Sequence, residues 1–254
     1  MAVWIGTSGW QYRHWRPGFY AGVPARSWLS HYTSHFDTVE LNGSFYRLPD
    51  RARFERWGDE LPDGFVMAVK MSRYLTHVRR LAEPAEPVAR FLAAATGLGD
   101  HLGPVLIQLP PNLRADPAAL AATLACFPPG IKVAVEPRHD SWFTTEVCDL
   151  LAGRGAAFVE ADRQGRLGPA WRTAPWRYLR FHVGRAHPEP CYGREALDTW
   201  ARGLVGTTEA YAYFNNDPLG CALRDARLFA AAAHRHGLEP TRVPPASLTP
   251  VLAA

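Results

Sequence analysis

The stretch KVAVEPRHDSWF, residues 132–143, decides how the rest of the chain is interpreted. Its first part, Val133–Val135, is apolar and typical of a strand buried on both faces. With only Pro137 interposed, the chain then carries four titratable residues, namely Glu136, Arg138, His139 and Asp140. A buried strand that ends in charged groups brings those groups to one edge of a sheet. If other strands end in the same way, the chain has a shared polar site there.

Similar apolar runs, rich in Val, Ile, Phe and Tyr, recur along the chain and predict further strands. We expect strands at Val3–Gly6, Thr38–Leu41, Phe65–Val69, Val105–Leu109, Ile131–Val135, Ala156–Glu160, Tyr178–Phe181 and Ala210–Phe214. The segments between them predict helices at Pro24–His35, Asp50–Glu60, Pro84–Thr96, Asp116–Cys126, Ser141–Ala152, Glu195–Leu204 and Pro218–His236. The sixth connection, Asp162–Pro175, is rich in Gly, Arg and Pro, and we expect an irregular loop there.

Strands that alternate with helices predict parallel βαβ units and an α/β fold. Eight such units in 254 residues suit a closed (β/α)8 TIM barrel, and we predict a single domain over residues 1–254. The main alternative is a doubly wound open sheet. Its dinucleotide-binding form is disfavoured, because no G-x-G-x-x-G follows the first predicted strand.

Alternate residues of a strand share a face, and each predicted strand can place a polar group on one face at its C-terminal end. In chain order these positions are Gly6 and Ser8, Glu40 and Asn42, Lys70, Gln108, Glu136, Glu160 and Asp162, Arg180 and His182, and Tyr213 and Asn215. In a barrel they would converge over the C-terminal mouth, where this fold has its active sites. The alternative is a set of structural ion pairs between the acids and bases.

The composition is that of an ordinary soluble globular protein, with 47% hydrophobic and 20% charged residues. A net charge of +4 permits an anionic partner without requiring one. The N-terminus MAVWIGTSGW lacks a basic region followed by a long apolar run, so we predict no signal peptide. No apolar stretch approaches the length of a membrane span, so we expect no membrane partner.

The four cysteines are Cys126, Cys148, Cys191 and Cys221, and they are scattered along the chain. None forms a C-x-x-C pair, which disfavours a zinc knuckle or a dithiol redox motif. We therefore expect buried or incidental thiols in a reducing compartment, and a cytoplasmic protein.

Seven motifs, in this order along nearly the whole chain, are shared with one known family: IGTSGWQYRHW, FDTVELNGSFYRLP, VKMSRYLTHVRRL, LGPVLIQLPP, VEPRHDSW, LRFHVG and YAYFNND. The chain thereby resembles the YecE-like family, bacterial and archaeal proteins classed as a domain of unknown function (domain of unknown function 72). The resemblance implies a TIM-barrel-like fold, but it implies no particular reaction, because the family has no settled activity. Pro137 departs from the family pattern, which usually has an aromatic residue there, and Asp225 stands where an asparagine is usual.

The expected catalytic groups are Glu136, Glu40 and His182. Glu136 ends a buried strand beside cationic Arg138, so it is the first candidate for a general acid or base. Glu40 is the natural second carboxylate, unless it only holds the LNGSFY turn, and His182 could transfer protons near neutral pH. Paired carboxylates suit glycoside hydrolysis and also proton abstraction next to a carbonyl, so we expect a hydrolase or an isomerase or lyase.

The expected substrate is a small polar molecule that is anionic or sugar-like. Lys70 and Arg180 could clamp a phosphate or carboxylate, lysine as a compact charge and arginine as a two-pronged donor. The full set of expected substrate-binding residues is Ser8, Trp10, Asn42, Lys70, Gln108, Arg138, Trp142, Arg180, Tyr213 and Asn215.

Two other functions stay open. The loop 9–20 mixes Trp10, Tyr12, Trp15, Phe19 and Tyr20 with basic residues, and aromatic rings beside cations can stack bases and hold phosphates. The chain could therefore bind or process nucleic acid, although the same rings could simply pack as a lid. The third reading is a non-catalytic barrel that binds a ligand.

The residues identify no cofactor. The chain has no H-x-H, no H-E-x-x-H and no EF-hand loop, so the support for a divalent metal is weak and we predict no metal ligands. If a magnesium or manganese ion were bound, its ligands would come from Glu136, Glu160, Asp162 and His182.

Overall fold

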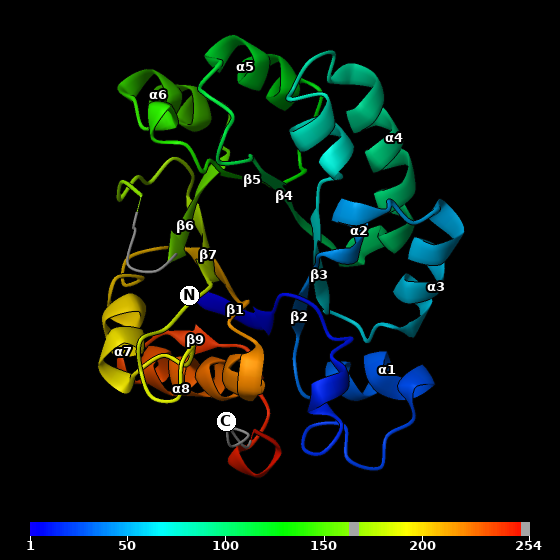
Figure 1. The fold of residues 1–254 in the computed structure, drawn as a ribbon, viewed down its shortest axis with the longest axis vertical. Helices are drawn as coiled ribbons and strands as arrows, with labels where there is room; N and C mark the ends of the chain where they lie inside the picture. The colour runs from blue at the N-terminus through cyan, green and yellow to red at the C-terminus, as the bar shows by residue number, and fades with distance from the viewer. Residues whose placement is uncertain (163–167, 250–254) are drawn as a thin grey trace. The chain divides into compact units, whose positions relative to one another are not determined.

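The structure is a computed structural model of the chain, and it describes residues 1–162 and 168–249. Figure 1 labels its strands and α-helices. The strands are β1 (Ala2–Thr7), β2 (Thr38–Leu41), β3 (Val66–Lys70), β4 (Leu102–Gln108), β5 (Val133–Glu136), β6 (Ala157–Asp162), β7 (Trp176–Phe181), β8 (Glu209–Phe214) and β9 (Glu239–Pro240). The α-helices are α1 (Trp28–Thr33), α2 (Gly43–Tyr46), α3 (Arg51–Glu60), α4 (Ala85–Ala95), α5 (Pro117–Ala125), α6 (Thr145–Gly153), α7 (Arg194–Arg202) and α8 (Cys221–Arg235).

The strands follow one another in a nine-stranded sheet in the order β2-β3-β4-β5-β6-β7-β8-β1-β9. Each strand pair whose register is resolved, for example β4 with β5, is parallel. The predicted α/β class and the eight predicted strands are therefore confirmed, with shifted ends. The core strands are apolar on both faces, as parallel strands covered by helices must be.

The predicted closed TIM barrel is not confirmed, and the partners of the β1 backbone are the reason. Thr241, just after β9, donates its N–H to the Val3 carbonyl at 2.8 Å, and its hydroxyl accepts the Ile5 N–H at 2.9 Å. The Thr7 N–H donates to the Tyr32 hydroxyl at 3.1 Å. In a closed barrel these backbone groups of β1 would pair with β2. Here they are already satisfied, and β2 and β9 stand at the two ends of the strand order.

Helix starts follow their capping residues. Asp50 accepts from the Arg53 N–H and begins α3, and Asp116 accepts from the Ala119 N–H and begins α5. The helix predicted from Ser141 begins later, because the Thr144 side chain caps α6 through the Val147 N–H.

Three further differences concern short elements. The helix predicted from Pro24 divides into a 3-10 turn, Ala25–Ser27, followed by α1. The sequence did not indicate α2, β9 or the π-helical turn Tyr74–Val78. Of the irregular sixth connection, residues 168–175 form no helix, and residues 163–167 lie outside the described residues.

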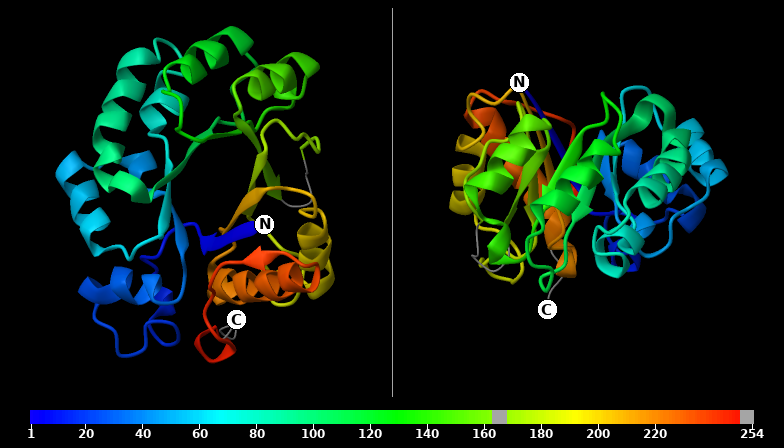
Figure 2. Two further views of the ribbon diagram at one scale, coloured as in Figure 1. Left: turned by 180° about the vertical axis from the view of Figure 1, so that it is seen from behind. Right: turned by 90° about the horizontal axis from the view of Figure 1, so that it is seen from above.

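The chain divides into two compact units, and each is described by itself. Unit 1 comprises Met1–Glu40, Ala161–Leu167 and Tyr178–Ala254, and unit 2 comprises Leu41–Glu160 and Gly168–Arg177. In unit 1, α8 packs against β1, β8 and α7, and both views in Figure 2 show α7 and α8 side by side. In unit 2, α3 packs against α4, and α5 packs against α6. A single domain over residues 1–254 stays a prediction.

The cysteines correct one expectation. Cys191 and Cys221 form a disulfide, whereas the sequence predicts reduced thiols throughout. Cys191 lies in the connection between β7 and α7, and Cys221 is the first residue of α8, so only the fold brings them together. Cys126 and Cys148 are free thiols, as predicted. The disulfide removes one of the arguments for a reducing compartment.

None of the helices in residues 1–162 and 168–249 is long and apolar enough to cross a membrane.

Candidate functional site

The C-terminal ends of β3, β4 and β5 bring four predicted site residues of unit 2 together, namely Lys70, Gln108, Glu136 and Arg138. We call this group the Lys70–Arg138 cluster. Gln108 and Glu136 are opposite one another in the register of β4 and β5, and Lys70 is opposite Leu106 of β4. Parallel strands end at the same edge, so neighbouring polar ends meet there. The alternation inferred from the sequence therefore places these side chains together.

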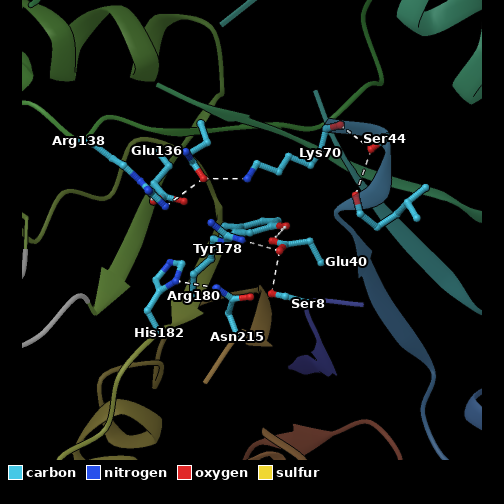
Figure 3. Close-up of polar contacts among 12 residues, drawn as sticks. Ser8, Glu40, Ser44, Lys70, Glu136, Arg138, Tyr178, Arg180, His182 and Asn215 are labelled. Carbon is cyan, nitrogen blue, oxygen red and sulfur yellow. Dashed lines mark hydrogen bonds and ion pairs between the residues drawn. The ribbon is translucent and has the colours of Figure 1, made fainter. Parts of the chain in front are cut away.

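Hydrogen bonds fix the geometry of the Lys70–Arg138 cluster. The Gln108 Oε1 atom accepts from Lys70 Nζ at 2.8 Å and from Arg138 Nη2 at 3.0 Å. Arg138 Nε also donates to Glu136 Oε1 at 2.9 Å. Figure 3 shows Lys70 and Arg138 approaching one another from opposite sides, next to Glu136. One amide oxygen thus holds two cations in place, and one of these cations holds the carboxylate.

The Lys70–Arg138 cluster is buried, and Arg138 is its most accessible member. The relative exposure is 1% for Glu136 and 8% for Lys70, whereas the Arg138 side chain is 25% exposed. The ammonium of Lys70 also lies 4.1 Å from the centre of the Phe45 ring, a cation–π contact. Two cations and one carboxylate in a desolvated position are costly unless they pair with one another or with a ligand.

A second group, in unit 1, surrounds Glu40. We call Ser8, Glu40, Tyr178 and Arg180 the Glu40 cluster. Glu40 Oε1 accepts from Ser8 Oγ at 2.8 Å and from Arg180 Nη2 at 2.8 Å, and Oε2 accepts from the Tyr178 hydroxyl at 2.7 Å (Figure 3). Glu40 is fully buried and Arg180 is 2% exposed. The ion pair and its two neutral donors therefore satisfy both carboxylate oxygens.

The surroundings of Glu40 decide its ionisation. Burial by itself raises the pKa of this carboxyl, but the charge of Arg180 and the hydrogen bonds from Arg180, Tyr178 and Ser8 outweigh it, so the pKa lies below its usual value. Burial and the neighbouring Glu40 raise the pKa of Tyr178 well above its ordinary value. Glu40 is therefore a carboxylate and Tyr178 a phenol donor at neutral pH.

His182, just beyond β7 in unit 1, lies beside Asn215, just beyond β8. The Asn215 Nδ2 and His182 Nδ1 atoms are 2.9 Å apart (Figure 3). The backbone supports this contact, because the Asn215 N–H donates to the Phe181 carbonyl at 2.8 Å. An amide bonded to one ring nitrogen fixes the orientation of the imidazole and its tautomer.

The remaining predicted site residues lie in other surroundings. Trp142 is fully buried and donates its indole N–H to the Leu113 carbonyl at 2.8 Å. Tyr213 is fully buried, with its hydroxyl 2.8 Å from Thr38 Oγ1, and Trp10 is 3% exposed. Asn42 precedes α2 and accepts the Phe45 N–H at its carbonyl.

The aromatic loop 9–20 is largely packed. Trp15, Phe19 and Tyr20 are each at most 2% exposed, and they stack on one another and on α1, for example Tyr20 on Trp28 at 4.6 Å between ring centres. The Trp15 indole donates to Asp217 at 2.7 Å. Rings buried in this way do not present faces on which bases could stack.

The acids proposed as metal ligands have other partners. Glu160 accepts from Arg177 through both of its oxygens, at 2.7 Å and 2.5 Å, as a two-pronged ion pair. Within the described ranges, no group of three or more His, Cys, Asp or Glu side chains is arranged to hold a metal ion.

Two contributors were missed at the sequence level. Tyr178 was counted only as a strand residue, although it precedes Arg180 by two positions and so shares its face. Phe45 belongs to the shared motif FDTVELNGSFYRLP, but nothing in the sequence indicated that its ring would underlie Lys70. The Lys70–Arg138 cluster and the Glu40 cluster belong to different units, and the expected single ring of polar groups stays a prediction.

The comparisons with known proteins agree with the fold. A DUF72 family protein from Thermotoga maritima MSB8 has a similar structure, with a TM-score of 0.77 and 26% identity over 92% of this chain and 100% of that chain. One from Enterococcus faecalis V583 has a TM-score of 0.76 at 19% identity, over 91% and 95% of the two chains, and shows the fold alone.

Curated relatives match over a shorter region. The UPF0759 protein YecE of Escherichia coli K12 is 28% identical over 154 residues, which is 60% of this chain and 54% of that protein. The UPF0759 protein YunF of Bacillus subtilis is 30% identical over 151 residues, 56% and 52% of the two. The chain thus spans about half the length of these relatives in the match.

The model of the family described as "Protein of unknown function DUF72" matches residues 4–248. Because this match spans nearly the whole chain, the protein belongs to the DUF72 family.

Proposed function

We propose that the protein is an enzyme that binds a small polar, anionic substrate at the Lys70–Arg138 cluster and uses Glu136 as its general acid or base. The observation that supports this proposal is the sharing of Gln108 Oε1 by two cations beside a carboxylate that is 1% exposed. Apolar side chains would stabilise strand ends at a lower desolvation cost. A buried charge cluster at the C-terminal edge of a parallel sheet is where α/β proteins bind and transform ligands.

Glu136 suits acid–base chemistry better than Glu40 does. Glu40 receives donors on both oxygens and has a lowered pKa, so it holds no proton to give near neutral pH. We assign it the role of orienting Arg180. Glu136 has Arg138 as its partner, and Arg138 is the more accessible residue of the two. A substrate anion that draws Arg138 toward itself would leave Glu136 a stronger base.

The proposed chemistry is a proton transfer at a carbon or oxygen next to the bound anionic group. Lys70 and Arg138 hold the anion, and Gln108 keeps the two cations at a fixed separation, which limits reorganisation during the reaction. Glu136 then removes or returns the proton. His182, held by Asn215, belongs to unit 1, and its role in proton transfer stays a prediction. This reaction class includes isomerases and lyases. A glycosidase would need Glu40 as a second carboxylate.

The test is a conversion screen with a matched pair of variants. The wild-type chain is incubated with pools of sugars, sugar phosphates and hydroxy acids, and conversion is followed by NMR. We expect Glu136→Gln to lower turnover of any converted substrate about 100-fold or more, because a positioned acid or base contributes at least that much. Glu60→Gln is the control, since Glu60 is an exposed glutamate on α3 outside the cluster. Equal turnover in wild type and Glu136→Gln would refute the role of Glu136.

Two other proposals predict different outcomes. A non-catalytic ligand-binding protein would be stabilised thermally by a ligand that no variant converts. Nucleic-acid binding would appear as retention on single-stranded DNA that is lost steeply with salt. The packed rings of loop 9–20 give that reading no stacking platform. The closed (β/α)8 barrel and the cytoplasmic location stay predictions.

A further inference from the structure

The segment Ser72–Glu83, which joins β3 to α4 in unit 2, follows an unusual backbone path. It contains the π-helical turn Tyr74–Val78, and Arg80, Leu81 and Glu83 have φ values of 51°, 69° and 48° although none of them is glycine. Such a conformation costs on the order of 1 kcal/mol or more per residue. π-Turns and left-handed side-chain residues concentrate at functional sites. The question is what this path positions.

The path brings His77 next to the Lys70–Arg138 cluster through Phe45, and the segment carries two further basic side chains, Arg73 and Arg80, whose charges act on His77. The His77 ring packs edge-on against Phe45 at 4.9 Å, and the same Phe45 ring lies 4.1 Å from Lys70 Nζ. Phe45 therefore contacts both the imidazole and the ammonium. Arg80 donates to the Asn112 carbonyl at 2.8 Å, which fixes its guanidinium over the loop that follows β4.

The electrostatics of His77 agree with the contacts through Phe45. Burial lowers the pKa of His77, and the positive charges of four residues lower it further, namely Lys70, Arg73, Arg138 and Arg80. His77 Nδ1 is 2.8 Å from Thr76 Oγ1, which fixes the ring. The imidazole is thus neutral, rigid and surrounded by positive charge. Glu136, bonded to Arg138, is the acid that the Lys70–Arg138 cluster itself supplies.

We propose that the segment Ser72–Glu83 and the Lys70–Arg138 cluster together form a phosphoryl-binding site, in which Arg73, His77 and Arg80 supplement Lys70 and Arg138. This inference rests on the proposed function, because it names the anionic group of the substrate as a phosphate ester. A phosphoryl group carries close to two negative charges and three acceptor oxygens at neutral pH. It can therefore engage several guanidinium, ammonium and imidazole donors at once, whereas a carboxylate offers one charge and two oxygens.

The test measures binding of inorganic phosphate to the full chain by calorimetry at pH 8 and low ionic strength. We expect one saturable site per chain. Arg73→Gln and Arg80→Gln should each raise the dissociation constant about 10-fold, since each removes a charge-assisted hydrogen bond. Arg56→Gln is the matched control, because Arg56 is an exposed arginine on α3 and the substitution removes the same charge. It should change the constant less than about 2-fold.

Folding of the variants is checked, because a misfolded variant would also bind phosphate less tightly. Arg73 and Arg80 are exposed, so we expect both variants to fold, and the thermal midpoint of each is measured beside wild type. Absence of saturable binding would overturn the inference. So would an equal weakening by Arg56→Gln, because that would show a response to net charge alone.

The source of the phosphoryl group is decided by two further ligands. If it is a small phosphate ester, glucose 6-phosphate should bind with the same ranking of variants and be displaced by inorganic phosphate. If it is a nucleic-acid backbone, a ten-residue oligothymidylate should bind more tightly with that same ranking. Both results support the site. If Arg73→Gln and Arg80→Gln leave the dissociation constant of either ligand unchanged, the proposed site is overturned.

Failure of this inference is distinguishable from failure of the proposed function. Glu136→Gln should lower turnover about 100-fold or more yet leave phosphate binding unchanged or tighter, because it removes a negative charge beside Arg138. Phosphate binding together with unaltered turnover in Glu136→Gln would refute only the acid–base role. The opposite case is a wild-type chain that converts an unphosphorylated substrate and does not bind phosphate. If Glu136→Gln lost that turnover, only the phosphoryl site would be refuted.

Discussion

Glu40 and Asp225 are both fully buried carboxyls of unit 1, yet their surroundings move their pKa values in opposite directions. Arg180 and its neighbours lower the pKa of Glu40 despite burial. Asp225 accepts from the Tyr192 N–H and from Asn216 Nδ2, both at 2.7 Å, and burial outweighs these bonds and the charge of Arg224, so its pKa rises to about 6. Glu40 therefore contributes stability that is lost as pH falls through its folded pKa. Asp225 opposes folding increasingly as pH rises from about 4 to about 6.

Asp225→Asn should therefore stabilise the protein near neutral pH. The shift of the Asp225 pKa from 3.8 to about 6 corresponds to roughly 3 kcal/mol at pH 7, and asparagine keeps an oxygen for the two donors. We expect the free energy of unfolding in urea to rise by about 2–3 kcal/mol at pH 7 and to change little at pH 4. The exposed Asp63→Asn is the control and should change stability by less than about 0.5 kcal/mol. A variant less stable than wild type at pH 7 would contradict this account.

Glu40→Gln should have the opposite effect. It leaves the Arg180 guanidinium, 2% exposed, without its carboxylate, and breaking a buried pair in this way costs about 3–5 kcal/mol. The control is Glu55→Gln, which breaks the exposed Arg51–Glu55 pair and should cost less than about 1 kcal/mol. Urea unfolding at pH 7 measures both. Equal losses of unfolding free energy in the two variants would show that the buried Glu40–Arg180 pair contributes no more stability than an exposed pair.

The connection between β7 and α7 is tied to α8 by two interactions, the Cys191–Cys221 disulfide and the bond from the Tyr192 N–H to Asp225. The bridged residues are 30 positions apart, and a loop of that length predicts about 3–4 kcal/mol of stabilisation in the chain-entropy description. Reductant should therefore lower the thermal midpoint of wild type. The double variant Cys191→Ala with Cys221→Ala should have that lower midpoint whether or not reductant is present.

The control for the disulfide uses the two free thiols. Cys126→Ala with Cys148→Ala should keep the wild-type midpoint and the wild-type response to reductant, because neither thiol is cross-linked. If wild type gave the same midpoint with and without reductant, the bridge would not stabilise this connection.

Strands and helices were predictable to different extents, for physical reasons. The strands stand out because each is a short run that is rich in Val, Ile, Phe and Tyr or continuously apolar, and Asp50 and Asp116 mark helix starts through their side-chain acceptors. The start of α6 was misplaced because His139 and Ser141 bond to one another and hold a separate 3-10 turn, Asp140–Trp142. The π-helical turn Tyr74–Val78 was not predictable, since no glycine marks the left-handed residues after it.

The site was predictable where it depends on strand alternation. Lys70, Gln108 and Glu136 follow from that rule and do lie together in unit 2. Contacts made by loops, and pairing between segments far apart in the sequence, could not be predicted from strand alternation. Arg80 reaches the loop after β4 only through its left-handed backbone, and Thr241 occupies the β1 edge from far along the sequence. The sequence pattern of a strand determines which side chains lie on one face at its end. Tertiary contacts determine which other residues those side chains contact.

The account of the chain as an anion-handling enzyme requires that a ligand occupy the Lys70–Arg138 cluster. A crystal structure of the protein grown with a phosphate ester such as glucose 6-phosphate tests this requirement. The prediction is ligand density with a phosphate oxygen about 3 Å from Lys70 Nζ and from the Arg138 guanidinium, and with Arg73 or Arg80 as a further donor. A cluster without ligand density at a saturating concentration, while the ligand occupies another surface, would contradict the account.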